Sequence, residues 1–200
     1  MSLQIINQDE QKISVKLQGI PLQYANALRR ICLNGVPIFA IDTVDILENS
    51  SIIADEGIAH RLGLIPLKTE FSAIESNNES DRILLTLDSG HTDETRTVFS
   101  DEIKSNDSFV KPISDKIPIV TLAPDQKIRI EAHAKLGRGT EHAKWNSSNI
   151  ATLTDTNKDD ERILTVETTG ALEPKHIILA GINELSSRLD SFKEIISDLK

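Results

Sequence analysis

Apolar residues near the C-terminus recur at alternating intervals of four and three positions, and this heptad pattern constrains the fold more than any other feature. Such spacing places them along one side of a helix, and Pro174 suits the first turn of that helix. Ile177 and Ile195 widen the stripe. A stripe of about three heptads either covers the chain's own sheet or packs partly on another chain. The residues of this C-terminal stripe are Ile178, Ile182, Leu185, Leu189, Phe192, Ile196 and Leu199.

The rest of the chain reads as short strands, two shorter helices and polar loops. Residues 128–136 alternate between apolar and polar side chains, which predicts a half-buried strand. Residues 22–34 and 55–62 predict helices, with Asp55 as a plausible cap, whereas polar residues 72–81 predict a loop. This mixture predicts an α+β fold. Further strands are predicted near the N-terminus, at 13–17, 37–47, 83–87, 95–99, 117–122 and 150–154, and from residue 162.

Composition excludes several classes of protein. The 200 residues carry a formal charge of −9, which disfavours a stand-alone nucleic-acid binder because phosphate contacts need a basic face. One cysteine, Cys32, is too few for a disulfide, a zinc ribbon or an iron–sulfur cluster. The polar N-terminus lacks the apolar segment of a signal peptide, and no apolar run approaches about 18 residues. We expect a soluble, cytoplasmic protein.

The segment DEGIAHRLGLIPL (55–67) gathers acidic, basic and histidine side chains. On a helix, Glu56 and His60 would share a face, as a pair of metal ligands can. The zincin pattern, however, needs two histidines at this spacing and a third ligand. Ile58, Ala59 and Leu62 would form an apolar side, so a docked helix with its charges outward is the better interpretation.

Two other segments carry chemically suggestive residues. In GTEHAKW (139–145), Glu141 and His142 resemble a base and its orienting group, but no nucleophile accompanies them. His142, Lys144 and Trp145 would suit an interface, with Trp145 as an anchor. Arg29 and Arg30 lie on the polar side of the predicted helix 22–34, where they either interact favourably with the helix dipole or pair with an acidic partner surface.

Four segments in order resemble one family, the D-type subunits of archaeal DNA-directed RNA polymerase. That family is similar to the third-largest subunit of eukaryotic polymerase II and to the N-terminal domain of the bacterial alpha subunit. The resemblance implies an α+β fold. A discontinuous dimerisation domain of a sheet and two long helices (1–46 and 146–200) would hold an inserted, mostly β domain (47–145). The matching segments are ANALRRICLNGVPIFAIDTV (25–44), DEGIAHRLGLIPL (55–67), GRGTEHAKW (137–145) and VETTGALEPKHIILAGINEL (166–185).

The same resemblance implies a function in assembly rather than catalysis. A D-type subunit pairs with the small subunit L through long helices, and with subunits N and P the pair supports the two large catalytic subunits. The C-terminal stripe from Ile178 to Ile196 would therefore contact an L-type subunit. Neither the iron–sulfur insertion nor the zinc-binding cysteine cluster of some relatives is expected, because residues 146–166 and the inserted domain, where relatives carry them, contain no cysteine. Candidate contacts to the large subunits are Arg29, Arg30, His60, Arg61, His142, Lys144 and Trp145.

Two alternatives remain open. A small metal-dependent hydrolase could use Glu56, His60 and His142 if the segments that carry them converged in space. Direct contact with promoter DNA through a local basic patch is a second alternative, against which the negative net charge argues.

Overall fold

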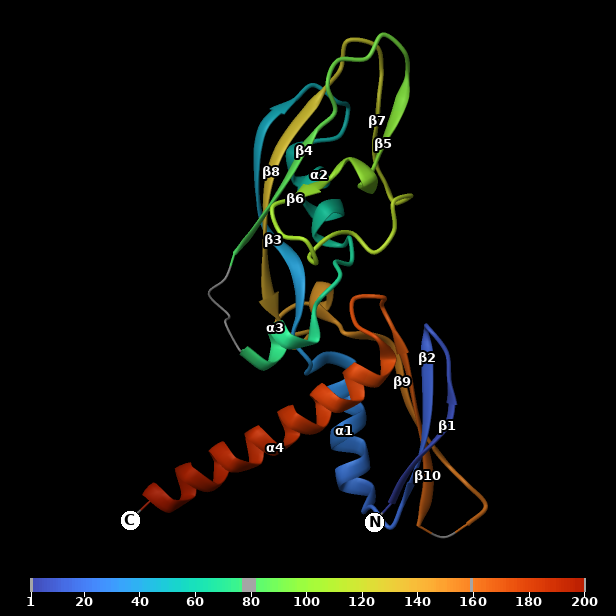
Figure 1. Ribbon diagram of the computed structural model, residues 1–200. Helices are drawn as coiled ribbons and strands as arrows, with labels where there is room; N and C mark the ends of the chain where they lie inside the picture. The colour runs from blue at the N-terminus through green and yellow to red at the C-terminus, as the bar shows by residue number, and fades with distance from the viewer. Residues whose placement is uncertain (1, 77–81, 159, 200) are drawn as a thin grey trace. The chain divides into compact units, whose positions relative to one another are not determined.

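A computed structural model of the chain describes residues 2–76, 82–158 and 160–199 (Figure 1). The described residues divide into two compact units. Unit 1 comprises residues 1–37 and 138–200, and unit 2 comprises residues 38–137. The chain thus leaves unit 1 once, builds unit 2 and returns. Helices and antiparallel strands occur in both units, which confirms the predicted α+β class.

Unit 1 is a four-stranded antiparallel sheet with two helices packed on it. The strand order is β1-β2-β10-β9, so strands from the two ends of the chain pair at the centre. Ile13, Val15 and Leu17 of β2 are buried on one face, as their alternation predicts. The elements of unit 1 are β1 (Ser2–Gln8), β2 (Lys12–Gln18), α1 (Leu22–Asn34), η2 (Ala143–Trp145), β9 (Ser148–Asp155), β10 (Glu161–Thr168) and α4 (Pro174–Asp198).

Helix α1 packs against β9 and β10 through its apolar side and is tied down at its C-terminal end. The last carbonyls of a helix lack intrahelical partners. Here the hydroxyls of Ser147 and Ser148 donate to the Cys32 carbonyl at 2.9 and 2.7 Å. The backbone N–H of Thr140 donates to the Asn34 carbonyl at 3.2 Å. The returning chain therefore closes the end of α1.

Unit 2 contains a second sheet of order β3-β8-β4-β6 and a two-stranded sheet of β5 and β7. The predicted alternation of residues 128–136 is confirmed, because Ile128, Ile130, Ala132, Ala134 and Leu136 are all buried. The elements of unit 2 are β3 (Ile38–Asn49), α2 (Asp55–Gly63), α3 (Phe71–Ser76), β4 (Ile83–Asp88), β5 (Arg96–Phe99), η1 (Ser100–Glu102), β6 (Lys104–Ser105), β7 (Pro118–Leu122) and β8 (Ile128–Gly137).

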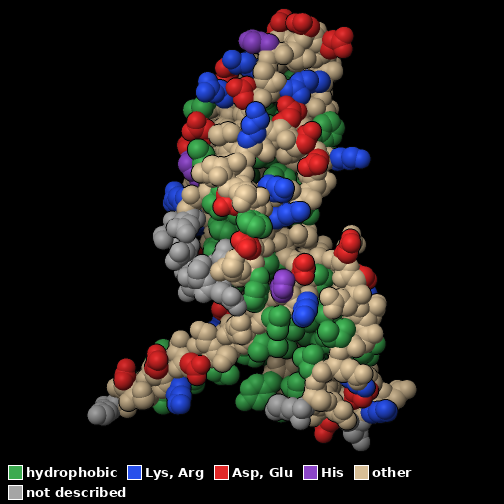
Figure 2. Space-filling model, viewed as in Figure 1, with side chains coloured by type: hydrophobic (Ala, Val, Ile, Leu, Met, Phe, Trp, Pro, Cys, Tyr) green, Lys and Arg blue, Asp and Glu red, His purple; other side chains and the backbone are tan. Residues whose placement is uncertain are grey.

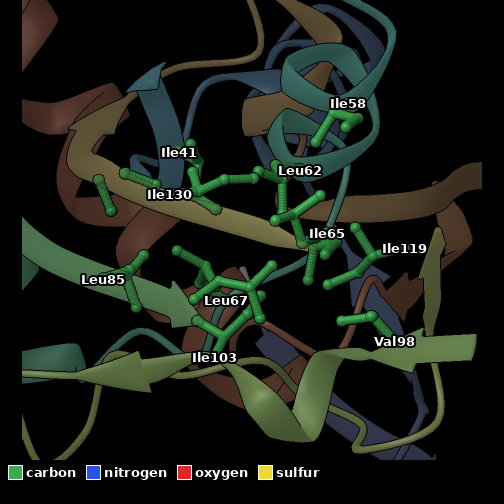
Figure 3. Packing of buried hydrophobic residues seen from close by; sticks show 14 of the residues in the cluster. Ile41, Ile58, Leu62, Ile65, Leu67, Leu85, Val98, Ile103, Ile119 and Ile130 are labelled. Atoms are coloured by element: carbon green, nitrogen blue, oxygen red, sulfur yellow. The ribbon is translucent and has the colours of Figure 1, made fainter. Parts of the chain in front are cut away.

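An aliphatic core fills the described part of unit 2. Figure 3 shows Ile58 and Leu62 of α2 and Ile41 of β3 directed into the same cluster as Ile130 of β8 and Leu85 of β4. The cluster contains few aromatic side chains, in keeping with an aromatic content of 4%. Helix α2 is thus held by its apolar side, as its sequence predicted.

The boundaries of the units differ from those drawn from the sequence. The sequence placed the inserted segment at 47–145, whereas the compact unit spans 38–137. The physical reason is the long pairing of β3 with β8, which runs from Ile38 opposite Gly137 to Asn49 opposite Ile128. Hydrogen bonding along the full length of both strands draws the whole of β3 into unit 2.

Two local predictions need correction. Asp55 is the first residue of α2 rather than its cap, because the N-cap position is Ala54 and the Asp55 carboxylate accepts a hydrogen bond from the Asn49 side chain at 2.7 Å. The loop predicted at 72–81 begins inside the short helix α3, and its residues 77–81 lie outside the described residues.

Candidate interaction surfaces

Helix α4 runs well beyond the unit on which it begins. Every described residue from Ser186 to Leu199 is exposed, including the large apolar side chains of the C-terminal stripe. Phe192 is 60% exposed, and Leu189, Ile196 and Leu199 are each at least half exposed. About 20 Å of helix, at 1.5 Å per residue, therefore presents an apolar side that no other described residue of unit 1 covers. The ribbon shows this part of α4 extending away from α1 (Figure 1).

The start of α4 is anchored in unit 1. Ile177 and Ile178 are buried, and Gly181 lies against Cys32, Leu28 and Ile31 of α1. A Cβ at position 181 would lie 3.1 Å from the Cys32 sulfur, so the absence of a side chain permits the close crossing of the two helices. The C-terminal stripe thus divides into a buried beginning and an exposed remainder.

This division changes the assignment of one predicted contact. Ile178 was predicted to contact an L-type subunit, but it is only 4% exposed and belongs to the core of unit 1. Its heptad position lies in the anchored start of α4, one turn before Gly181 at the crossing with α1. Ile182, Leu189, Phe192 and Ile196 are exposed, and Leu185 is half-buried. These five residues carry the available part of the stripe.

The two arginines of α1 have different environments. Arg29 is half-buried, and its guanidinium donates to the Ala151 carbonyl of β9 at 3.3 Å and to the Asn26 side chain at 3.4 Å. It therefore braces α1 on the sheet. Arg30 is exposed, so of the pair it is the one available for a contact outside the chain.

Helix α2 shows a similar division. The Arg61 guanidinium donates to the Pro118 carbonyl of β7 at 2.8 Å and so ties the helix to the two-stranded sheet. His60 is exposed, as is Leu64 just after the helix. Asp55 and Glu56 lie in the first turn and His60 and Arg61 in the last, an arrangement that suits the helix dipole. Its charges therefore stabilise the helix itself, and His60 is also accessible to a partner.

Trp145 is a predicted contact to the large subunits and a candidate interface anchor, and its side chain lies inside the chain. The side chain is 4% exposed, inside the turn that joins unit 2 back to unit 1. The Lys144 ammonium lies 4.2 Å from the centre of the Trp145 ring, and the His142 Nδ1 accepts from the Lys144 backbone N–H at 3.1 Å. The Trp145 ring is therefore packed inside the turn, and the contacts of His142 and Lys144 stabilise it.

The residues of the hydrolase alternative fall in different units. Glu56 and His60 belong to unit 2, whereas His142 belongs to unit 1. Within the described residues, no three His, Cys, Asp or Glu side chains are grouped so that they could hold a metal ion. Burial raises the pKa of the Cys32 thiol to about 12, so that sulfur stays protonated near neutral pH.

Four exposed apolar side chains near the N-terminus were not predicted from the sequence. Leu3 and Ile5 on β1 and Leu22 and Tyr24 at the start of α1 are all exposed, and we call them the N-terminal patch. The alternation of Leu3 and Ile5 predicts a strand with one apolar face, but it gives no information on whether a helix covers that face. Figure 2 shows hydrophobic side chains gathered over α1 in this unit.

Comparison with known proteins gives a consistent result. Residues 41–157 match the sequence model of a family described as RNA polymerase Rpb3/RpoA insert domain. The chain is 44% identical over 146 residues to DNA-directed RNA polymerase subunit Rpo3 of Pyrococcus horikoshii, covering 72% of this chain and 56% of the relative. The subunit Rpo3 of Methanocaldococcus jannaschii is 39% identical over 172 residues, covering 86% of this chain and 84% of the relative.

The match to some relatives is partial. The chain spans slightly more than half the length of the Pyrococcus proteins that it matches. No helix among the described residues is long and apolar enough to span a membrane.

Proposed function

Since this chain belongs to the Rpo3 family of archaeal DNA-directed RNA polymerase, whose members are the D-type subunits, we propose that it is a non-catalytic assembly subunit. It pairs with the small subunit L, and with subunits N and P the pair forms the platform on which the two large catalytic subunits assemble. It acts in the cytoplasm, where transcription takes place.

One observation carries this proposal. The distal half of α4 presents an uncovered apolar side from Ile182 to Leu199. An isolated helix of this length is marginal in water, because most helical stability in proteins comes from packing of an apolar side. A second chain that covers the stripe stabilises the helix by packing on it. It also buries several large side chains, each contributing about 1.5–3 kcal/mol when fully buried.

Contacts to the large subunits are assigned to the accessible charged groups. Arg30 on α1 and His60 on α2 are exposed. Arg29 and Trp145 are engaged within the chain, and Arg61, although exposed, donates to the Pro118 carbonyl. Arg29, Arg61 and Trp145 stabilise the local structure around the contact residues. We therefore place the direct contacts at Arg30 and His60 and a supporting role at the other three.

The assembly role needs no cofactor on this chain. A structural zinc site or an iron–sulfur cluster uses several cysteine thiolates, and the chain has one cysteine, which is buried. We propose that neither group is bound. The hydrolase alternative has no observation in its favour, since no three His, Cys, Asp or Glu side chains of the described residues are grouped as metal ligands would be.

Capture of the tagged full-length chain from its native host tests the assembly role. We expect subunit L and both large subunits to co-purify, as identified by mass spectrometry. Charge reversal in Arg30→Glu, or the introduction of a carboxylate in His60→Glu, should lower the recovery of the large subunits about tenfold relative to subunit L, because each places a negative charge at a proposed contact.

Lys116→Glu is the matched control, since Lys116 is equally exposed but lies in a loop outside the family segments. It should leave recovery unchanged. Capture of the wild-type chain without any polymerase subunit would contradict the assembly role.

A further inference from the structure

An ion pair lies at the point where α4 leaves unit 1. The helix first crosses α1, where Gly181 lies against Cys32. Three residues later, the Glu184 Oε1 lies 3.5 Å from the Arg138 Nε. Leu185 is half-buried, and every described residue of α4 after it is exposed. The ion pair is therefore placed between the anchored start of the helix and its exposed remainder.

Arg138 belongs to a turn that is fastened to the end of α1. Its carbonyl accepts from the Glu141 N–H at 2.9 Å, and its own N–H donates to the Glu141 carboxylate at 3.2 Å. In the same turn, the Thr140 N–H donates to the Asn34 carbonyl at the end of α1. The Arg138 guanidinium is thus presented to α4 by a segment whose own position is fixed.

The Glu184 carboxylate is held from two directions. The Arg188 Nε, one turn further along α4, donates to the Glu184 Oε1 at 2.8 Å. The side chains of Glu184 and Arg138 are 18% and 22% exposed. Water and salt screen a partly buried pair less than an exposed one, so the attraction between helix and turn is retained at ordinary ionic strength.

The length of the exposed helix makes its direction sensitive to this contact. The crossing at Gly181 brings the two helices close, but a helix held at one crossing can still tilt about it. About 21 Å of helix follows Glu184, at 1.5 Å per residue, so a tilt of about 10° would move its far end by roughly 4 Å. Interface cores pack as densely as protein interiors, which leaves no room for such a displacement. A second contact beside the crossing restricts the tilt.

The ion pair and the C-terminal stripe occupy different sides of α4. Gly181 and Arg188 share a side of the helix with Glu184, since they are three and four positions away from it. Leu189 and Phe192 lie about 80–140° round the helix from Glu184, at about 100° per residue. Substitution of Glu184 therefore leaves the apolar side chains of the stripe unchanged.

We propose that Arg138 and Glu184 are positioning residues, whose ion pair sets the direction in which the distal half of α4 leaves unit 1 and so presents the C-terminal stripe to the L-type subunit. The identity of the partner rests on the proposed function, whereas the direction of α4 is a property of this chain alone. Without the ion pair the helix samples several directions, and only the fraction in the competent direction binds.

Distances between two spin labels on the full-length chain test the direction of α4. The labels are attached at Ser191→Cys on the distal half and Thr154→Cys on β9, both exposed positions. Cys32 stays unlabelled, since it is buried and protonated near neutral pH. The chain should give one narrow distribution of distances. Arg138→Met and Glu184→Gln should each widen it at least twofold.

The dissociation constant for the L-type subunit is the second readout. Arg138→Met and Glu184→Gln should each weaken pairing about fivefold, because the competent direction is populated only part of the time. The double variant should pair no more weakly than either single variant, since both substitutions remove the same contact. Arg138→Lys keeps the positive charge and should restore most of the affinity.

Lys16→Met with Glu161→Gln is the matched control. These two side chains form another partly buried ion pair of unit 1, with the charged atoms 3.7 Å apart, but they lie on β2 and β10. Loss of this pair should destabilise unit 1 to a similar extent. It should leave the distance distribution and the dissociation constant unchanged, which separates positioning from stability.

The results distinguish the positioning role from the proposed function. A narrow distribution in both single variants, additive effects on pairing, or unchanged pairing despite widened distances would each overturn the positioning role. Equal widening in the control variant would overturn it too. A chain that does not pair with the L-type subunit, although the two variants widen the distribution as expected, would overturn the proposed function and support the control of helix direction.

Discussion

Replacement of Leu189 and Phe192 by aspartate should weaken pairing with the L-type subunit by at least about a hundredfold. Each substitution removes about 1.5–3 kcal/mol of apolar burial from the interface and introduces a charge that must lose its water. A loss of about 2.8 kcal/mol already corresponds to a hundredfold change in the dissociation constant. Isothermal titration or sedimentation of the purified chains gives the constant directly.

The same substitutions should leave unit 1 intact. Both side chains are exposed on the distal part of α4 and lie beyond the anchored segment at Ile177 and Ile178. The matched control is Ser187→Asp with Ser191→Asp, which adds the same two charges to the opposite side of the helix. Pairing of the control should match the wild type. Unimpaired pairing of Leu189→Asp with Phe192→Asp would remove the stripe from the interface.

Gly139→Ala should strongly destabilise unit 1, by about 2–4 kcal/mol in the free energy of unfolding. A Cβ at this position would lie 2.1 Å from the Asn146 side-chain oxygen and 2.9 Å from the Asn34 Cα. The second atom belongs to the backbone at the end of α1, so relief of the clash must move the turn away from that helix. Separation would weaken the hydrogen bonds that Thr140, Ser147 and Ser148 make to the end of α1.

Denaturant unfolding followed by circular dichroism measures this effect. Gly63→Ala is the control, because its nearest neighbour would be the Ile41 carbonyl oxygen at an ordinary 3.7 Å and alanine favours helix. It should change the free energy of unfolding by less than about 0.5 kcal/mol. A stable Gly139→Ala variant would show that the turn is not packed on α1 as described.

Sequence periodicity predicted the regular elements well, because burial of one side of a helix or strand requires apolar residues at regular intervals. The alternation at residues 128–136 and the heptads of α4 both reflect one apolar side of an element. Periodicity does not identify the element that covers that side. Ile178 and Phe192 occupy the same stripe, yet one is in the core and the other in solvent.

Residue type was a weaker guide to the candidate contacts. A lone tryptophan beside a glycine turn is typical of an interface anchor, but Trp145 fills the turn itself. Arg29 and Arg30 are adjacent in sequence, and only the structure separates the brace from the exposed group. The environment of each side chain depends on contacts between distant segments, which short patterns do not encode.

The most direct test of the central claim is the mass of the co-expressed pair. The full-length chain and the L-type subunit of the same genome are purified together and measured by light scattering on a sizing column. The account predicts one peak with the mass of one copy of each chain. Separate peaks for the two chains, with this chain a stable soluble monomer, would contradict it.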